Sequence, residues 1–141
     1  MINKLIGSFI LITLASNCWS ASLADNGDGT VTDFDTGLVW QQQDDNIMRT
    51  QGNAISYCNG LALDGKSDWR LPQIKELTSI VDYRVTDPSI DDALFPGTNL
   101  SSYWSASSFA SNSADAWNVD FGFGFVFASV KTDSRYVRCV R

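Results

Sequence analysis

Cysteine is the residue type whose number and placement in this chain point most clearly to chemistry. The 141-residue sequence holds three cysteines: Cys18 in an N-terminal leader, and Cys58 and Cys139 far beyond it. Residues 1–20 carry Lys4, an apolar run and then small residues, which is the pattern of a secretory signal peptide. Export leads to an oxidising compartment, where two remaining thiols tend to pair. We therefore predict one disulfide bond between Cys58 and Cys139.

The other side chains offer little for catalysis. The chain has no histidine, so it lacks the commonest general base as well as histidine-based triads and metal sites. Pairing of the two cysteines would leave no thiolate nucleophile or zinc ligand. Glu76 is the single glutamate, and we expect its carboxylate to accept hydrogen bonds from Arg70 or a backbone turn. Arg70 could form a buried ion pair with Asp68 or Glu76. We expect no enzymatic activity.

Oxygen ligands for calcium are the one metal-binding possibility in the sequence. Asn118 and Asp120 are two residues apart on an expected strand, so their side chains share one face. Carboxylates from a nearby loop, such as Asp91 and Asp92, could complete a set of hard oxygen ligands for Ca²⁺. The alternative is that Asn118 and Asp120 form the polar outer face of an antiparallel strand. No other cofactor is expected.

Aromatic and basic side chains supply further candidate contacts. Tyr103, Phe109 and Phe123 lie beside expected turns and are candidates for exposed contacts with a ligand. Most of the tryptophans flank apolar strand residues, and we assign them to the core. Arg135 and Arg138 belong to a cluster of basic residues near the C-terminus, which could form a local anion-binding patch or simply lie in solvent. The formal net charge of −6 argues against nucleic acid as a partner, because phosphate binding needs clustered lysine and arginine.

The leader divides the chain into a signal peptide, residues 1–20, and a single domain, residues 25–141. Cleavage could follow Ser20 or occur as late as Ala24, and a lipoprotein would instead carry its lipid on Cys18. The apolar run of the leader is too short to span a membrane, and no later stretch approaches that length. We therefore expect a secreted, periplasmic or cell-surface protein without a membrane span in its mature part.

Hydrophobic periodicity and turn residues predict an α+β domain. An N-terminal hairpin precedes two amphipathic helices and a long loop, and an antiparallel sheet follows. The expected ranges are strands 30–34 and 38–41, helices 51–63 and 73–82, loop 84–101, and strands 103–107, 116–121, 125–130 and 136–140. Pro72 suits the first position of the second helix. Cys139 on the last strand would tie that strand to the first helix.

Several short motifs along the chain resemble one family. They include Asp28-Gly29-Thr30-Val31-Thr32-Asp33, Asp68-Trp69-Arg70-Leu71-Pro72, Tyr103-Trp104-Ser105-Ala106 and Val137-Arg138-Cys139-Val140-Arg141. In this order they are similar to the DUF1566 or Lcl C-terminal domain family. The resemblance implies a C-type-lectin-like fold, with two helices packed on a small twisted antiparallel sheet and one disulfide. It also implies a bacterial secreted or surface protein.

The family includes an adhesin that suggests binding to sulfated glycans, but this chain is acidic and has no collagen-like tract. We predict a non-catalytic, exported binding or adhesion module that recognises a glycan or a protein at the cell surface. The expected contact face comprises loops 84–101 and 108–115 and the outer side of strand 116–121, since loops on a rigid scaffold carry most binding sites. Alternatives are a structural subunit of an envelope assembly or an enzyme on a scaffold like that of formylglycine-generating enzymes. The sequence does not predict the oligomeric state.

Overall fold

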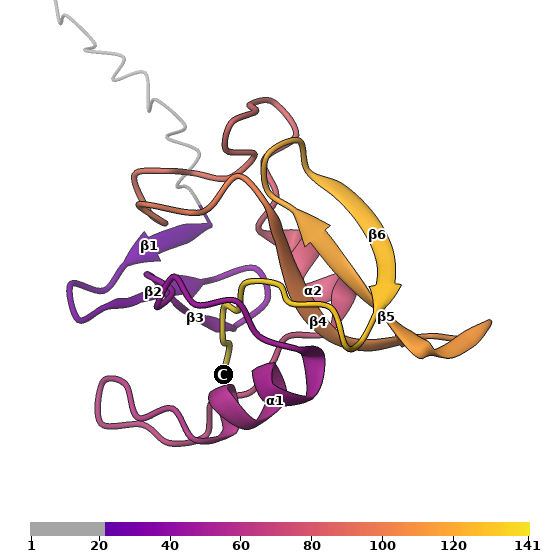
Figure 1. Cartoon of the computed structure of the whole chain (residues 1–141). Helices are drawn as coiled ribbons and strands as arrows, with labels where there is room; N and C mark the ends of the chain where they lie inside the picture. Colours follow the sequence, from indigo (N-terminus) through magenta and orange to yellow (C-terminus); the bar gives the residue numbers. More distant parts are fainter. Residues whose placement is uncertain (1–21) are drawn as a thin grey trace, which may run out of the picture.

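The computed structural model describes residues 22–141, so the predicted signal peptide and Cys18 lie outside the described residues (Figure 1). The fold is α+β, with two three-stranded antiparallel sheets and two short helices. The elements in chain order are β1 (Leu23–Asp25), β2 (Thr30–Asp33), β3 (Val39–Gln41), α1 (Gln51–Asn59), α2 (Ile74–Ser79), β4 (Ser102–Phe109), β5 (Asn112–Asp120) and β6 (Phe125–Val130). No helix within residues 22–141 is long and apolar enough to cross a membrane.

The first sheet has the order β1-β2-β3 and contains the predicted N-terminal hairpin as β2 and β3. Asp33 caps the turn between them, because its carboxylate accepts from the backbone N–H of Asp35 at 2.9 Å. The strand β1 was not predicted. It pairs with β2 so that Leu23 lies opposite Asp33. Cleavage after Ala24 would therefore remove two of the three β1 residues.

Helix α1 begins where the sequence predicts and ends earlier. The Thr50 side chain accepts a hydrogen bond from the backbone N–H of Asn53, as an N-cap does. The helix stops at Asn59 before Gly60, whereas the prediction continued to residue 63. The chain then reverses between Leu63 and Lys66 through Asp64 and Gly65, which both have positive φ. This arrangement matches a type I′ turn.

Helix α2 is also shorter than the predicted range 73–82. Gln73 is its N-cap, and the Gln73 backbone N–H donates to Glu76 Oε1 at 2.8 Å. Pro72 therefore precedes the N-cap and is not the first helical residue. Arg70 donates to both carboxylate oxygens of Glu76, at 2.7 and 2.8 Å, and this pair is partly exposed rather than buried. Asp68 pairs instead with Arg141.

The second sheet has the order β4-β5-β6. Strand β6 has the predicted range 125–130, whereas β5 begins well before the predicted range 116–121, and the predicted loop 108–115 is wrong. Strand β4 continues to Phe109 and β5 begins at Asn112, so most of that segment forms a hairpin that projects from the body (Figure 1). Phe109 packs edge-to-face on Trp117 with ring centroids 5.0 Å apart. This contact helps to hold the hairpin together despite its many small polar residues.

The C-terminal segment 135–141 connects the two sheets, where a regular strand over 136–140 was predicted. Tyr136 pairs with β4: its N–H donates to Ser102 O, and its carbonyl accepts from Trp104 N–H, each at 3.0 Å. Farther along, Arg141 exchanges two backbone hydrogen bonds with Val39 of β3, at 2.8 and 2.9 Å. The segment therefore covers one edge of each sheet.

The predicted disulfide is confirmed. Cys58 of α1 and Cys139 of the C-terminal segment are bonded and fully buried, with their Cα atoms 5.5 Å apart. They lie in a core cluster with Trp69, Trp104 and Val137. A second cluster packs α2 and the long loop against the other face of β4 and β5. Its buried members are Val31, Trp40, Leu77, Ile80, Ile90, Phe95, Tyr103, Val119, Phe121 and Val140.

The Cys58→Ser variant should unfold much more easily than the oxidised protein. The bridge spans 81 residues, and closing a loop of that size in the unfolded chain contributes about 4–5 kcal/mol. Urea unfolding followed by tryptophan fluorescence measures the difference. Treating the unmodified protein with reductant should lower its free energy of unfolding by a similar amount. Coincident midpoints for the variant and the oxidised protein would contradict this account.

A chain that begins at Asp25 should be less stable than one that begins at Ala21. The shorter chain lacks Leu23 and Ala24, so it loses most of the pairing between β1 and β2 and the packing of Leu23 on the core. A drop in Tm of several degrees is expected for a loss of about 1–2 kcal/mol. Equal melting curves for the two chains would show that β1 contributes no stability.

Candidate functional site

Tyr103 does not contact solvent, which corrects its predicted role as a ligand contact. Its ring is fully buried in the core. Its hydroxyl donates to the Asp44 carboxylate in a short hydrogen bond and accepts from the Asn99 backbone N–H at 2.9 Å. Burial raises the pKa of Tyr103 to about 12, and the hydrogen bond to Asp44 adds to that effect. Tyr103 is therefore a structural residue.

Arg138 was also predicted to contact a ligand, and it is fully buried as well. Its guanidinium donates to the carbonyl oxygen of Gln41 at 2.8 Å, to that of Gln42 in a short bond, and to Thr98 Oγ1 at 2.9 Å. Asp44 supplies the counter-charge at 3.7 Å. Burial lowers the pKa of Arg138, while the Asp44 carboxylate favours the charged form. The predicted role is corrected: this arginine is occupied within the fold.

The four predicted calcium ligands serve separate local structures. Asn118 is fully buried, and its side-chain amide donates to Ser129 Oγ at 2.9 Å. Asp120 Oδ1 accepts from the backbone N–H groups of Gly122 and Phe123 in the turn before β6. Asp91 similarly caps a turn in the long loop, and Asp92 is exposed. Within residues 22–141 no three acidic, histidine or cysteine side chains gather to hold a metal ion.

The predicted contacts Phe109 and Arg135 are partly exposed. Phe109 lies against Trp117 near the tip of the β4–β5 hairpin. Arg135 extends over the Trp104 ring, 5.8 Å from its centroid, and donates to Ser129 Oγ at 3.2 Å. Arg135 therefore lies near β6, whereas Arg138 is in the core and Arg141 pairs with Asp68. The structure does not bring these arginines together as one basic patch.

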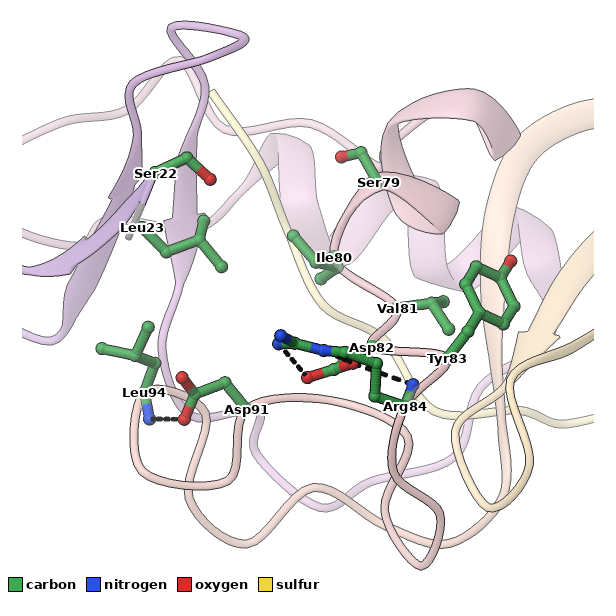
Figure 2. A pocket seen from close by; sticks show the side chains of 10 residues that line it. All are labelled: Ser22, Leu23, Ser79, Ile80, Val81, Asp82, Tyr83, Arg84, Asp91 and Leu94. Atoms are coloured by element: carbon green, nitrogen blue, oxygen red, sulfur yellow. Dashed lines mark hydrogen bonds and ion pairs between the residues drawn. The ribbon is translucent and has the colours of Figure 1, made fainter. Parts of the chain in front are cut away.

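A hollow of about 460 Å³ lies between β1 and the chain after α2 (Figure 2). Apolar side chains such as Leu23, Ile80 and Leu94 are part of its lining. Arg84 lies in the hollow and bonds to Asp82, which lowers the pKa of Asp82 to about 2. The two charges neutralise each other, and the lining offers no histidine or thiol. With its pKa lowered, Asp82 stays ionised near neutral pH and cannot act there as a general acid.

The most distinctive surface is an exposed aromatic row on β6 and the turn before it. Phe123, Phe125 and Phe127 are 58%, 59% and 47% exposed. The rings of Phe123 and Phe125 stack with centroids 5.9 Å apart, and Phe127 meets Phe125 edge-on at 6.3 Å. Val126 and Val130 add further exposed apolar area. We call these five residues the β6 apolar surface.

The sequence analysis identified only Phe123 of this surface. The available signal was a stretch of ten residues, 121–130, that contains no charged side chain and four phenylalanines. Such a stretch is equally compatible with a buried strand, since periodicity cannot distinguish the two cases. The neighbouring rings of Phe123, Phe125 and Phe127 form a contiguous exposed apolar area, and such areas mark interaction sites in soluble proteins. The β6 apolar surface is therefore the candidate functional site.

Comparison with known protein families gives a match over most of the described chain. The family model described as the Lcl C-terminal domain matches residues 29–141. This range begins just before β2 and includes both cysteines of the disulfide and the whole β6 apolar surface. No curated protein matches the chain.

The buried hydroxyl of Tyr103 predicts a specific loss of stability at alkaline pH. A tyrosine in the unfolded chain has a pKa of about 10, and the folded value is about 12. The folded state binds this proton more strongly, so its contribution is complete below pH 10 and disappears as pH rises through 12. The free energy of unfolding should fall by about 2–3 kcal/mol over that range.

The Tyr103→Phe variant cannot release this proton and should lose less stability than the unmodified protein between pH 10 and 12. Urea titrations at several pH values measure the slope. Tyr83→Phe is the matched control, because Tyr83 is 69% exposed. If the free energy of unfolding falls equally with pH in all three proteins, burial of the Tyr103 hydroxyl does not cause the loss of stability at alkaline pH.

Proposed function

The chain belongs to the Lcl C-terminal domain family, and we propose that it is a non-catalytic, exported binding module of bacteria. In this proposal it recognises a protein or glycan at the cell surface through the β6 apolar surface. The observation that carries the proposal is the exposed row of Phe123, Phe125 and Phe127 on a rigid sheet. Exposing three neighbouring phenylalanines is costly in water, and a partner that covers them would recover that free energy.

Chemistry of the described residues supports a binding role over an enzymatic one. The chain has no histidine, and the two cysteines beyond the leader are bonded to each other. The carboxylates of Asp82, Asp68 and Glu76 have lowered pKa values because arginines bind them. A general acid at neutral pH needs a raised pKa instead.

The ring geometry favours a protein over a glycan as the partner. A sugar-binding platform presents the flat faces of its aromatic rings outward. Here Phe123 and Phe125 pack against each other with their ring planes 22° apart, while the Phe127 ring is nearly perpendicular to that of Phe125. Such rings offer edges and an apolar ridge, which suit the side chains of another protein.

An extracellular location and a C-type-lectin-like architecture belong to the same proposal. The disulfide is compatible with an oxidising compartment. It links the first helix to the C-terminal segment, which is the connection that the lectin-like assignment requires. The two small antiparallel sheets are also consistent with that assignment.

The test compares binding by the unmodified protein with binding by a Phe123→Ser, Phe125→Ser, Phe127→Ser variant. Both are screened against an array of glycans and an array of purified bacterial envelope and host extracellular-matrix proteins. We expect protein hits that weaken at least tenfold in the triple variant, because about 3–4 kcal/mol of apolar burial is lost. Circular dichroism establishes that the variant is folded.

Phe34→Ser is the matched control, since Phe34 is 69% exposed but lies in the turn after β2, away from β6. It should bind as the unmodified protein does. Hits that survive the triple substitution would move the binding site elsewhere, and hits restricted to glycans would replace the protein partner. An absence of hits on both arrays would refute the binding role.

A further inference from the structure

We propose that the free edge of β6 binds an extended peptide segment of a partner protein, which adds a strand to the sheet. This inference rests on the proposed function and specifies how the partner is held. Backbone hydrogen bonds along the edge would supply affinity, and the side chains of β6 would select the residues of the bound strand.

The edge of β6 is open, whereas the C-terminal segment covers the outer edges of β3 and β4. Tyr136 pairs with the outer side of β4, and Arg141 with the outer side of β3. Strand β6 ends the order β4-β5-β6, and five of its six residues are exposed. Among the described residues the other uncovered edge belongs to β1, which has only three residues. Figure 1 shows β6 along the outer margin of its sheet.

The register identifies the backbone groups of β6 that face outward. Lys131 N–H donates to Ala114 O at 2.9 Å, which extends the register that pairs Asp115 with Val130. Because hydrogen-bonded and non-bonded pairs alternate in an antiparallel ladder, residues 125, 127 and 129 bond to β5. Val126 and Ala128 therefore direct their N–H and C=O groups toward the free edge. These four groups can pair with an incoming strand.

The strand has none of the features that protect exposed edges from pairing. Natural edge strands usually carry a lysine, a proline, an inward charge or a bulge. Residues 125–130 are Phe-Val-Phe-Ala-Ser-Val, with no charge and no proline, and their pairing with β5 is regular. Because successive side chains of a strand point to opposite faces of the sheet, Phe125 and Phe127 lie on one face and Val126 and Val130 on the other. An added strand would find apolar neighbours on both faces.

Surface area and charge favour a peptide over a second copy of the chain. The β6 apolar surface offers on the order of 450 Å², whereas a stable interface between folded proteins buries roughly 800 Å² per partner. An extended segment needs less area because it also gains main-chain hydrogen bonds. The net charge of −6 repels a second copy and favours a segment with basic residues beside its apolar ones.

The experiment uses a synthetic peptide of alternating valine and threonine, seven residues long, with lysine at each end and a fluorescent label. Fluorescence anisotropy measures its affinity for the full chain. Ala128→Pro removes one outward N–H without removing a bond to β5, and Ala128→Gly keeps that N–H. We expect binding at least tenfold weaker for Ala128→Pro and within about threefold for Ala128→Gly. Replacing the terminal lysines by glutamates should weaken binding severalfold.

The outcomes separate this inference from the proposed function. Equal affinity of Ala128→Pro and Ala128→Gly, with binding lost in the phenylalanine triple variant, would overturn strand addition and keep the apolar contact. Failure of the unmodified protein to bind the peptide would overturn the inference even if the arrays give hits. Sedimentation of the protein alone is the third arm: a dimer that Ala128→Pro abolishes would replace the peptide by a second copy. Circular dichroism and melting curves establish that both Ala128 variants are folded.

Discussion

The buried guanidinium of Arg138 is the interaction on which the arrangement of this domain depends. An unpaired charge in a protein interior costs several kcal/mol, so the groups around it must stay in place. Here they come from two separate parts of the chain: residues 41–44, which supply the Gln41 carbonyl and the Asp44 carboxylate, and Thr98 of the long loop. Asp44 also accepts from Tyr103 of β4. One cation thus fixes the relative positions of both sheets and the long loop.

This constraint explains how a thin domain closes. Arg138 holds the C-terminal segment in the core, and the neighbouring Cys139 bonds that segment to α1. On either side the backbone pairs with β4 and β3. The last seven residues therefore cover two sheet edges at once, which a single regular strand could not do. The segment approaches the second sheet only from the β4 side, so the opposite edge at β6 is left open.

The sequence predicted local features well and long-range polar ones poorly. The hairpin of β2 and β3, the Thr50 cap and the Arg70–Glu76 pair depend on residues close in sequence. Tyr103 and Arg138 looked like surface residues because their polar groups need partners, and those partners lie 59 and 97 residues away. The charge-free stretch 121–130 is the opposite example, since its composition is compatible with a buried strand but most of its large apolar side chains are exposed. Its exposure follows from the position of β6 at the sheet edge, which composition does not reveal.

An open apolar edge could pair with the same edge of a second copy, and the net charge of the chain opposes that pairing. Strand β6 itself carries no charge, but the whole chain carries −6. Two copies approaching edge to edge repel each other over about 8–10 Å at physiological salt. A neutral or basic segment meets no such barrier. Other proteins protect an open edge on the strand itself. In this chain the net charge opposes pairing between two copies, which favours a chemically different partner at the proposed edge.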